Sequence, residues 1–325
     1  MLTDAHHRTI DYVRLSVTDR CNLRCTYCMP EHMHFVNSKA LLNDEEILLL
    51  LQTLAGAGIS KVRITGGEPF LRPGLMQLLE KITRIPGIDE IAVTTNGVLT
   101  QPYIPALQAL GIRHINLSLD TLRADRFLQI TRRDKYAAVV DTLQSLLQQQ
   151  MQVKINVVVM ENVNTDELTD FAALTRDHAL SVRFIEEMPF NGQGHLFSGI
   201  NWHYQKILDT ISAAYPLEKI ADAPHSTSLN YHIPGHKGNI GVIPAYSRTF
   251  CGTCNRLRIS ATGSMKTCLY GNDVLNVKEI MRDPAQQPLL LSAIQLAIHQ
   301  RFANGFEAEK HHAEKYMESM SVIGG

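Results

Sequence analysis

The stretch "TDRCNLRCTYCMP" (residues 18–30) places three cysteines within eight residues, with the spacing Cys-x3-Cys-x2-Cys. It directly follows the apolar run "YVRLSV" (12–17), which predicts a β-strand. A structural zinc ion needs four protein ligands, whereas three thiolates around a four-iron cluster leave one iron free to bind something else. The spacing alone does not name the metal, and a zinc site completed by His32 or His34 remains an alternative.

A second group of three cysteines lies far along the chain. Cys251, Cys254 and Cys268 have the spacing Cys-x2-Cys-x13-Cys, and the two triplets together contain all six cysteines. Six cysteines in 325 residues are too few for a disulfide-stabilised scaffold. Clustered thiols in a reducing compartment are typical of metal or redox sites. We therefore expect a metal or redox site at each triplet.

The composition favours a folded protein without a nucleic-acid or membrane partner, so any site for a polyanion must be local. Hydrophobic residues make up 45% of the chain, and 31 basic residues nearly balance 32 acidic ones. A net charge of -1 gives no global field that would recruit nucleic acid or an anionic membrane. No apolar run reaches the roughly 18 residues of a membrane span, and the N-terminus does not resemble a secretory signal. We expect a cytoplasmic protein that binds neither nucleic acid nor membrane.

Six strand-like runs alternate with helical patterns over the first half of the chain. Asn43 and Glu46 form a capping-box pattern at the start of the first intervening helix. Parallel strands joined by helical crossovers form an open sheet or a barrel. We predict an α/β fold, a partial (β/α)6 TIM-like barrel over residues 1–187. Its strands are expected at 12–17, 61–65, 91–95, 114–119, 153–159 and 181–185, and its later helices at about 74–85, 103–109, 134–149 and 166–178.

Polar motifs follow three of these strands. "GGEP" (66–69) follows the second strand, "TNG" (95–97) overlaps the end of the third, and "SLD" (118–120) lies at the end of the fourth. Chemistry in α/β barrels and open sheets gathers at the carboxyl ends of strands. We expect these motifs to converge on one face with the cysteine loop.

The pattern changes after residue 187. The segment "NGQGHLFSG" (191–199) is loop-like, "GNIGVIPAY" (238–246) and "RLRISATGSMKTCLY" (256–270) predict short antiparallel strands, and "LLLSAIQLAIHQRF" (289–302) predicts a helix. We place a small C-terminal α+β extension at residues 188–325. It carries the second cysteine triplet.

The cysteine loop together with GGEP resembles the radical S-adenosylmethionine (SAM) superfamily. That resemblance implies a 4Fe-4S cluster whose open iron chelates SAM, and reductive cleavage of SAM to methionine and a 5′-deoxyadenosyl radical. The second triplet and the terminal "MSVIGG" (320–325) narrow the resemblance to the GTP 3′,8-cyclase family of molybdenum cofactor biosynthesis. This resemblance runs from about residue 12 to residue 325. It implies a lyase with a second 4Fe-4S cluster.

In that family the radical removes hydrogen from ribose C3′ of GTP, and the carbon radical attacks C8 of guanine. The expected product is (8S)-3′,8-cyclo-7,8-dihydroguanosine 5′-triphosphate, formed in the first step of molybdopterin biosynthesis. The resemblance further implies an electron donor such as flavodoxin or ferredoxin, and cyclic pyranopterin monophosphate synthase as the downstream enzyme. It is compatible with a homodimer.

The resemblance also assigns roles to individual residues. It implies that the SAM cluster is held by Cys21, Cys25 and Cys28, and the second, guanine-facing cluster by Cys251, Cys254 and Cys268. The residues expected to contact SAM are Tyr27, Gly67, Ser118 and Met188. Those expected to contact GTP are Arg14, Arg63, Thr94, Lys154, Arg256, Leu257 and Arg258. Besides the cysteines of the first triplet, catalytic roles are implied for Arg256, Arg258, Gly324 and Gly325.

The strand cations and the terminal glycines each also have a structural interpretation. Arg14, Arg63 and Lys154 lie in otherwise apolar strands, where a long cation is costly unless paired. Their joint presence favours an anion site over separate structural pairs, and Arg183 is a further candidate. The two terminal glycines enter the active site if the resemblance holds, and otherwise form a frayed end.

Two other functions remain open from the sequence. Another radical SAM enzyme with an auxiliary cluster, such as a peptide maturase, is one alternative, although such enzymes usually carry more cysteines. A zinc-ribbon protein that binds nucleic acid is the other, and it requires a fourth ligand such as His232 or His236. The balanced charge counts against the zinc ribbon.

Overall fold

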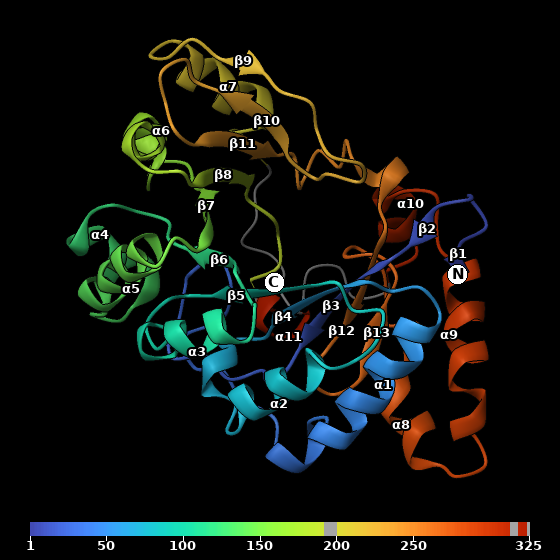
Figure 1. Ribbon diagram of the computed structural model, residues 1–325. Helices are drawn as coiled ribbons and strands as arrows, with labels where there is room; N and C mark the ends of the chain where they lie inside the picture. The colour runs from blue at the N-terminus through green and yellow to red at the C-terminus, as the bar shows by residue number, and fades with distance from the viewer. Residues whose placement is uncertain (192–199, 313–317, 324–325) are drawn as a thin grey trace.

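The computed structural model describes residues 1–191, 200–312 and 318–323. Its main feature is a curved twelve-stranded sheet whose central strands are parallel and follow the chain order. Helices lie along the outer side of the curve (Figure 1). The central strands are β3 (Tyr12–Ser16), β4 (Lys61–Thr65), β5 (Glu90–Thr95), β6 (His114–Ser118), β7 (Gln152–Val159) and β8 (Ser181–Glu186). The six predicted strands are confirmed within a residue or two.

The helices between these strands also agree with the sequence patterns. The capping box is present, since the Asn43 side chain accepts from Glu46 N at 2.8 Å and Glu46 accepts from Asn43 N at 2.8 Å. The predicted helices correspond to α1 (Asp44–Gly56), α2 (Leu75–Ile82), α3 (Ile104–Ala109), α5 (Tyr136–Gln148) and α6 (Leu168–Asp177). One further helix, α4 (Ala124–Thr131), was not predicted.

Apolar and polar side chains alternate along the central strands, so that one face of the sheet forms the hydrophobic core and the other lines the cavity. In β3, Val13 and Leu15 are fully buried in the hydrophobic core, whereas Tyr12 and Arg14 line the inner cavity. Successive side chains of a strand point to opposite faces. The outer face therefore packs against helices, and the inner face carries polar groups into the barrel.

The C-terminal region extends the same sheet at both edges. Strand β11 (Asn239–Ile243) pairs parallel to β8, and β12 (Arg256–Ile259) pairs parallel to β3. These segments were predicted as short antiparallel strands, and these two parallel pairings were not predicted, because an alternating pattern does not encode strand direction. Antiparallel pairs do join β12 to β13 (Ser264–Lys266), β13 to β14 (Leu275–Asn276), β11 to β10 (Leu229–His232), and β10 to β9 (Glu218–Lys219). The division at residue 187 remains a prediction.

The remaining elements cover the edges of the sheet. The predicted C-terminal helix is α9 (Leu290–His299), which packs near a small separate sheet of β1 (Leu2–Thr3) and β2 (Thr9–Ile10). The other helices are α7 (Tyr204–Ser212), α8 (Val277–Arg282), α10 (Gly305–Lys310) and α11 (Met320–Ile323). Short 3-10 helices lie at Ser38–Ala40, Pro69–Leu71, Gln101–Tyr103, Thr165–Glu167, Cys251–Thr253 and Gln287–Leu289.

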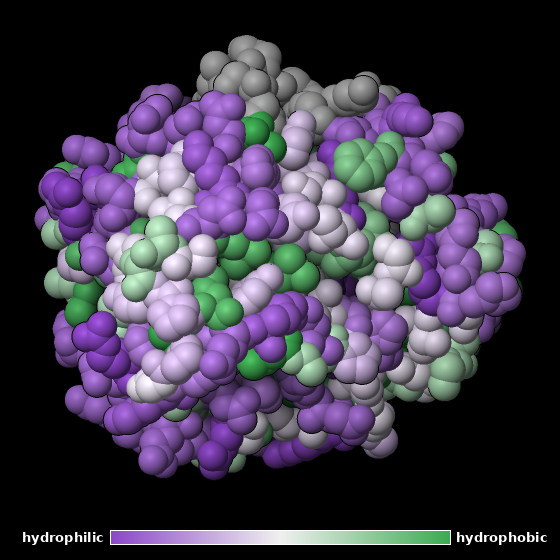
Figure 2. Space-filling view, turned by 90° about the horizontal axis from the view of Figure 1, so that it is seen from above, coloured by the Kyte–Doolittle hydropathy of each residue, from purple (hydrophilic) through white to green (hydrophobic). Residues whose placement is uncertain are grey.

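The surface agrees with the balanced composition. Seen from above, hydrophilic residues make up most of the face and hydrophobic ones gather around its middle (Figure 2). Within the described ranges, none of the helices has the length and apolar character needed to span a bilayer.

Candidate active site

One cavity of about 700 Å³ lies inside the curved sheet and is lined by both cysteine triplets. This volume lies in the range typical of small-molecule sites. Two sequence motifs more than 220 residues apart therefore meet at one site. The predicted SAM and GTP residues that line the cavity are Tyr27, Gly67, Ser118, Met188, Arg14, Arg63, Thr94, Lys154, Arg256 and Arg258, and Arg183 joins them.

Three predicted site residues are not placed in the cavity. Leu257 is fully buried in the hydrophobic core, because alternation along β12 turns its side chain away from the face that carries Arg256 and Arg258. The Leu257 side chain therefore does not face the cavity, and a GTP contact at Leu257 remains a prediction for its backbone. Gly324 and Gly325 lie outside the described residues.

The first cysteine loop is fastened to the end of α4. Arg24 N donates to Thr131 O at 2.9 Å, and Thr26 N donates to Ile130 O at 3.0 Å. Cys25 O accepts from Cys28 N at 3.0 Å, which closes a turn between the last two cysteines. The helix that sequence patterns missed thus positions the loop.

The glycines of GGEP allow close contact with the backbone of the cysteine loop. Gly67 N donates to Thr18 O at 2.8 Å, and Glu68 N donates to Arg20 O at 2.7 Å. A Cβ on Gly67 would lie 2.3 Å from Arg20 O, and one on Gly66 would lie 2.5 Å from Thr18 O. Glycine is required here because any side chain would push the cysteine loop away.

The carboxylate of Glu68 joins GGEP to the next motif, TNG. Glu68 is fully buried and accepts hydrogen bonds from Thr95 Oγ1, Asn96 N and Phe70 N at 2.8, 2.8 and 3.2 Å. Burial raises the pKa of Glu68 to about 7, although these donors favour the charged form. Asn96 Nδ2 in turn lies 3.6 Å from Cys21 Sγ. The motifs therefore act as one scaffold around the first triplet.

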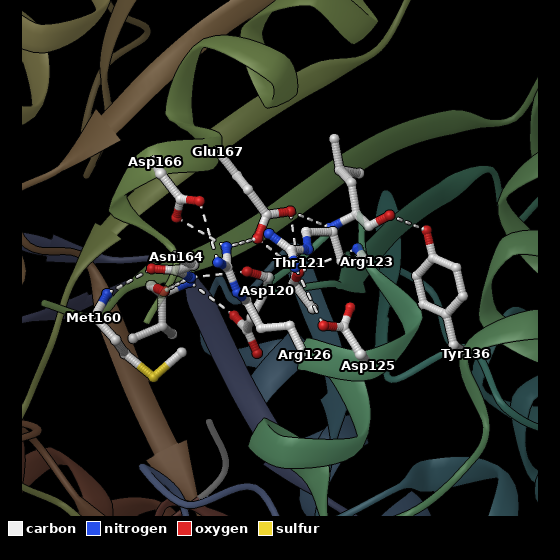
Figure 3. A network of polar contacts seen from close by, with 12 residues as sticks. Asp120, Thr121, Arg123, Asp125, Arg126, Tyr136, Met160, Asn164, Asp166 and Glu167 are labelled. Atoms are coloured by element: carbon white, nitrogen blue, oxygen red, sulfur yellow. Dashed lines mark hydrogen bonds and ion pairs between the residues drawn. The ribbon is translucent and has the colours of Figure 1, made fainter. Parts of the chain in front are cut away.

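Tyr27 is anchored by the aspartate of the SLD motif. Its hydroxyl donates to Asp120 Oδ2 at 2.8 Å, and Val158 N donates to Asp120 Oδ1 at 2.9 Å. Burial raises the pKa of Asp120 to about 6. Asn164 Nδ2 also donates to Asp120 O at 2.8 Å, within the network of Figure 3.

The rest of that network fixes the segment after Asp120. Buried Glu167 accepts from Thr121 Oγ1 at 2.7 Å and from Leu122 N at 2.6 Å, and it pairs with Arg126 of α4 (Figure 3). Both α4 and Asp120 are therefore held by the same group of residues. The cysteine loop contacts both of them.

The second triplet is surrounded by guanidinium groups. Arg301 Nη2 donates to Cys254 Sγ at 2.8 Å, and Arg8 Nη1 donates to Cys251 O at 3.0 Å. Burial would raise the pKa of Cys254, but Arg301 and Arg256 outweigh it and lower that pKa to about 7. Burial raises the pKa of the other five thiols. Cys254 is thus the thiol most readily deprotonated.

Arginines form a row across neighbouring strands on the inner face. Arg258 of β12 pairs in register with Arg14 of β3, which pairs with Arg63 of β4. Burial lowers the pKa of Arg258 to about 9 and that of Arg63 to about 10. Buried donors without a partner in the described residues include Nε of Arg14, Arg63 and Arg183 and the hydroxyl of Thr94. Since buried cations are costly unless paired, the row fits a polyanionic ligand.

Tyr12 belongs to this site and was missed in the sequence. It pairs in register with Arg256 on one side and Lys61 on the other, and it lines the cavity. Burial opposes its ionisation, but Arg63, Arg14 and Arg256 outweigh it and lower the pKa of Tyr12 to about 8. The alternation that places Arg14 on the inner face also places Tyr12 there.

The described part of the C-terminal tail docks on the first cysteine loop. Cys28 O accepts hydrogen bonds from Ser319 Oγ at 2.7 Å and from Met320 N at 3.3 Å. Met320 and Ser321 line the cavity. Residues 320–321 therefore reach the site, and the entry of Gly324 and Gly325 into it remains a prediction.

The donor sets fit iron–sulfur clusters better than single metal ions. Over residues 1–191, 200–312 and 318–323, no three His, Cys, Asp or Glu side chains converge to hold one ion. Neither His32, His34, His232 nor His236 lines the cavity. A four-iron cluster is larger than one ion and needs its thiolates spread around it. Three thiols facing one cavity at each triplet provide this arrangement.

Comparisons with known proteins agree with the fold and the cysteine motifs. Residues 15–175 match the family described as "Radical SAM superfamily", and residues 180–306 match "Molybdenum Cofactor Synthesis C". The structure resembles Streptococcus suis SuiB bound to S-adenosylmethionine, with a TM-score of 0.61 at 13% identity over 87% of this chain and 68% of that one. The family match over residues 15–175, together with the fold, thus assigns the chain to the radical SAM class.

Curated relatives narrow the family further. The chain is 39% identical to the GTP 3′,8-cyclase of Chlorobaculum tepidum, over 100% of this chain and 97% of the relative. It is 43% identical to molybdenum cofactor biosynthesis protein 1 of Homo sapiens, over 91% of this chain and 47% of the relative. The chain therefore spans about half the length of the latter group of relatives. It belongs to the GTP 3′,8-cyclase family of molybdenum cofactor biosynthesis, and the family resemblance inferred from the motifs is confirmed.

Proposed function

We propose that this chain is a radical SAM lyase that converts GTP to (8S)-3′,8-cyclo-7,8-dihydroguanosine 5′-triphosphate, the first step of molybdenum cofactor biosynthesis. The observation that carries the proposal is the row of arginines, in which the Nε atoms of Arg14 and Arg63 have no hydrogen-bond partner in the described residues, in a cavity that also holds both cysteine triplets. A nucleoside triphosphate supplies the missing negative charge, and it is small enough for a cavity of about 700 Å³.

The residues divide the cavity into two ends. Cys21, Cys25 and Cys28 would hold the first cluster, which with bound SAM supplies the radical that removes hydrogen. The SAM end is completed by Tyr27, Gly67, Ser118 and Met188. The second cluster would be held by Cys251, Cys254 and Cys268.

The cations orient the substrate between these ends. Arg14, Arg63 and Lys154 hold the triphosphate by charge-assisted hydrogen bonds, together with Thr94, Arg183, Arg256 and Arg258. Leu257 contributes through its backbone alone, since its side chain packs in the core. Burial of the reacting groups in the barrel keeps water away from reactive species.

Several partners belong to the same proposal. The protein would receive electrons from a donor such as flavodoxin or ferredoxin and pass its product to cyclic pyranopterin monophosphate synthase. We further propose a cytoplasmic location, and a homodimer is compatible with this function. We place a boundary at residue 187 between the barrel and the extension that carries the second cluster.

The test begins with iron and acid-labile sulfide per chain after anaerobic reconstitution, beside zinc analysis of the same sample. About eight irons and eight sulfides support two 4Fe-4S clusters, about four confine iron to one triplet, and zinc without iron supports the zinc-ribbon alternative. Incubation with GTP and SAM should then give methionine, 5′-deoxyadenosine and the cyclised nucleotide. SAM cleavage that depends on a peptide and not on GTP would support a peptide maturase.

Cysteine variants separate the roles of the two triplets. Cys25→Ala should abolish SAM cleavage. Cys268→Ala should retain some uncoupled cleavage and form no cyclised product, and product formation by this variant would exclude the second-cluster role. Removal of residues 324–325 should spare iron content and GTP binding but lose product. Normal turnover of the truncated chain would show that the tail is only a frayed end.

A further inference from the structure

Arg301 is a buried residue just after α9 that binds Cys254 through both arms of its guanidinium group. Nη2 donates to Cys254 Sγ at 2.8 Å, and Nη1 donates to Cys254 O at 2.9 Å. These two hydrogen bonds from one planar guanidinium group fix its position relative to Cys254. The backbone of Arg301 is also held, since its carbonyl lies 3.1 Å from His6 Nε2 and its N–H donates to Ile298 O at 3.1 Å.

The charge of Arg301 is directed at sulfur. In the part of the chain that the structure describes, no carboxylate forms an ion pair with Arg301. Its neighbours differ in this respect, because Arg8 pairs with Asp4 at 2.6 Å and Arg248 pairs with Glu309 at 2.8 Å. Arg8 also reaches the second triplet only through the carbonyl of Cys251.

The first triplet has no equivalent contact among the described hydrogen bonds. Cys21 Sγ accepts from Leu23 N at 3.4 Å and from Asn96 Nδ2 at 3.6 Å, and both donors are neutral. The nearby Arg24 donates instead to the carbonyls of Cys21 and Leu23, at 2.7 Å each. A charged donor to sulfur therefore distinguishes the second triplet from the first.

We propose that Arg301 is a positioning residue that holds the sulfur of Cys254 in place as a cluster ligand and raises the reduction potential of the cluster at the second triplet. A cation beside a ligand sulfur stabilises the form of the cluster that carries the extra electron, and hydrogen bonds to sulfur act in the same direction. The inference rests on the proposed function, because it requires a cluster at that triplet.

The experiment compares Arg301→Met and Arg301→Lys with the parent chain, each reconstituted anaerobically. Iron per chain is measured first, and both clusters are then titrated against potential by electron paramagnetic resonance. The first cluster serves as an internal reference. Asp4→Asn/Arg8→Gln is the matched control, since it removes a guanidinium beside Cys251 without changing the net charge or any bond to sulfur.

In Arg301→Met, the second cluster should titrate at a more negative potential than in the parent. In Arg301→Lys, the potential should shift in the same direction by a smaller amount, because lysine keeps the charge but loses the planar guanidinium group. The first cluster should be unchanged in both variants, and both clusters should be unchanged in the control. If Arg301→Met loses iron, the shift in the reduction potential of the second cluster in Arg301→Lys tests the inference instead.

Three results would overturn the inference. One is full iron content with an unshifted second cluster in Arg301→Lys and Arg301→Met. Another is an equal shift of both clusters. A parent chain with only four irons would overturn the second-cluster part of the proposed function, and the inference with it, so the two failures are distinguished by the iron count of the parent.

Discussion

Arg14 and Arg63 occupy directly paired positions on the adjacent parallel strands β3 and β4, and both line the same cavity. Like charges placed opposite each other on a sheet repel. Neither Nε has a hydrogen-bond partner in the described residues. The buried outer faces of the two strands, including Val13 and Val62, hold this arrangement in place. The fold thus holds Arg14 and Arg63 together against their electrostatic repulsion, and an anionic ligand bound between them would reduce that repulsion.

Arg63→Met should therefore weaken GTP binding without lowering the thermal stability of the ligand-free protein. Loss of a charge-assisted hydrogen bond costs about 1.5–3 kcal/mol, so GTP affinity should fall roughly 10- to 100-fold. The ligand-free protein should not lose thermal stability, because the variant replaces a buried and poorly paired cation with an apolar side chain. Calorimetric titration with GTP and a thermal melt without it measure the two effects.

Arg84→Met is the control for Arg63→Met. Arg84 lies on the exposed surface, pairs with Glu80 and does not line the cavity. Its replacement should leave GTP affinity unchanged. Equal affinities of Arg63→Met and the parent would contradict the placement of the triphosphate on the arginine row.

GTP affinity should fall as pH rises above 8. Burial and the nearby Arg183 and Arg63 lower the pKa of Lys154 to about 8, so Lys154 is charged below that pH and neutral above it. A bound triphosphate favours the charged form and raises its pKa, so binding takes up a proton in this range. Tyr12, with a pKa of about 8, gains negative charge over the same range and acts in the same direction.

Affinity measured from pH 7 to about pH 9.5 checks this dependence. Lys154→Arg stays charged throughout and should show a shallower decline. In the double variant Tyr12→Phe/Lys154→Arg, GTP affinity should be nearly independent of pH over this range. An identical slope in the parent and the double variant would mean that neither group faces the phosphates.

Two glycines beside cysteines should respond differently to an added methyl group. Gly67→Ala would place Cβ 2.3 Å from Arg20 O, so the loop of the first triplet must move and iron at that triplet should be lost. Gly252→Ala, between Cys251 and Cys254, meets nothing within 4 Å and should keep full iron content. Iron per chain measures both, and normal iron content in Gly67→Ala would show that the loop adapts to the contact.

The parts of the site that follow local sequence patterns were predictable. The six strands, the capped helix α1 and the inner-face cations follow from alternation and capping signals. The contacts of Arg301 with Cys254 and of α4 with the cysteine loop join segments far apart in the chain, and no periodicity records such contacts. The core position of the Leu257 side chain was not predicted, because a motif assigns a role to a run of residues, whereas a strand turns alternate side chains to opposite faces.

The side-chain hydrogen bond of Ser319 should help to hold the C-terminal tail on the first cysteine loop. Its hydroxyl donates to Cys28 O at 2.7 Å and lies 2.8 Å from Ser321 Oγ. Ser319→Ala removes a partly buried hydrogen bond of about 1 kcal/mol, which corresponds to roughly fivefold faster amide exchange in this segment if exchange follows local opening. Mass spectrometry of amide exchange over residues 318–322 measures it.

Ser292→Ala provides the matched control for Ser319→Ala. Its hydroxyl donates to Leu289 O at 2.8 Å on the exposed side of α9, away from the cavity. Exchange over residues 318–322 should be unchanged in this variant, and iron content should be unchanged in both. If Ser319→Ala exchanges as slowly as the parent, the Met320 N–H bond to Cys28 O suffices to hold the tail, and the hydroxyl is dispensable.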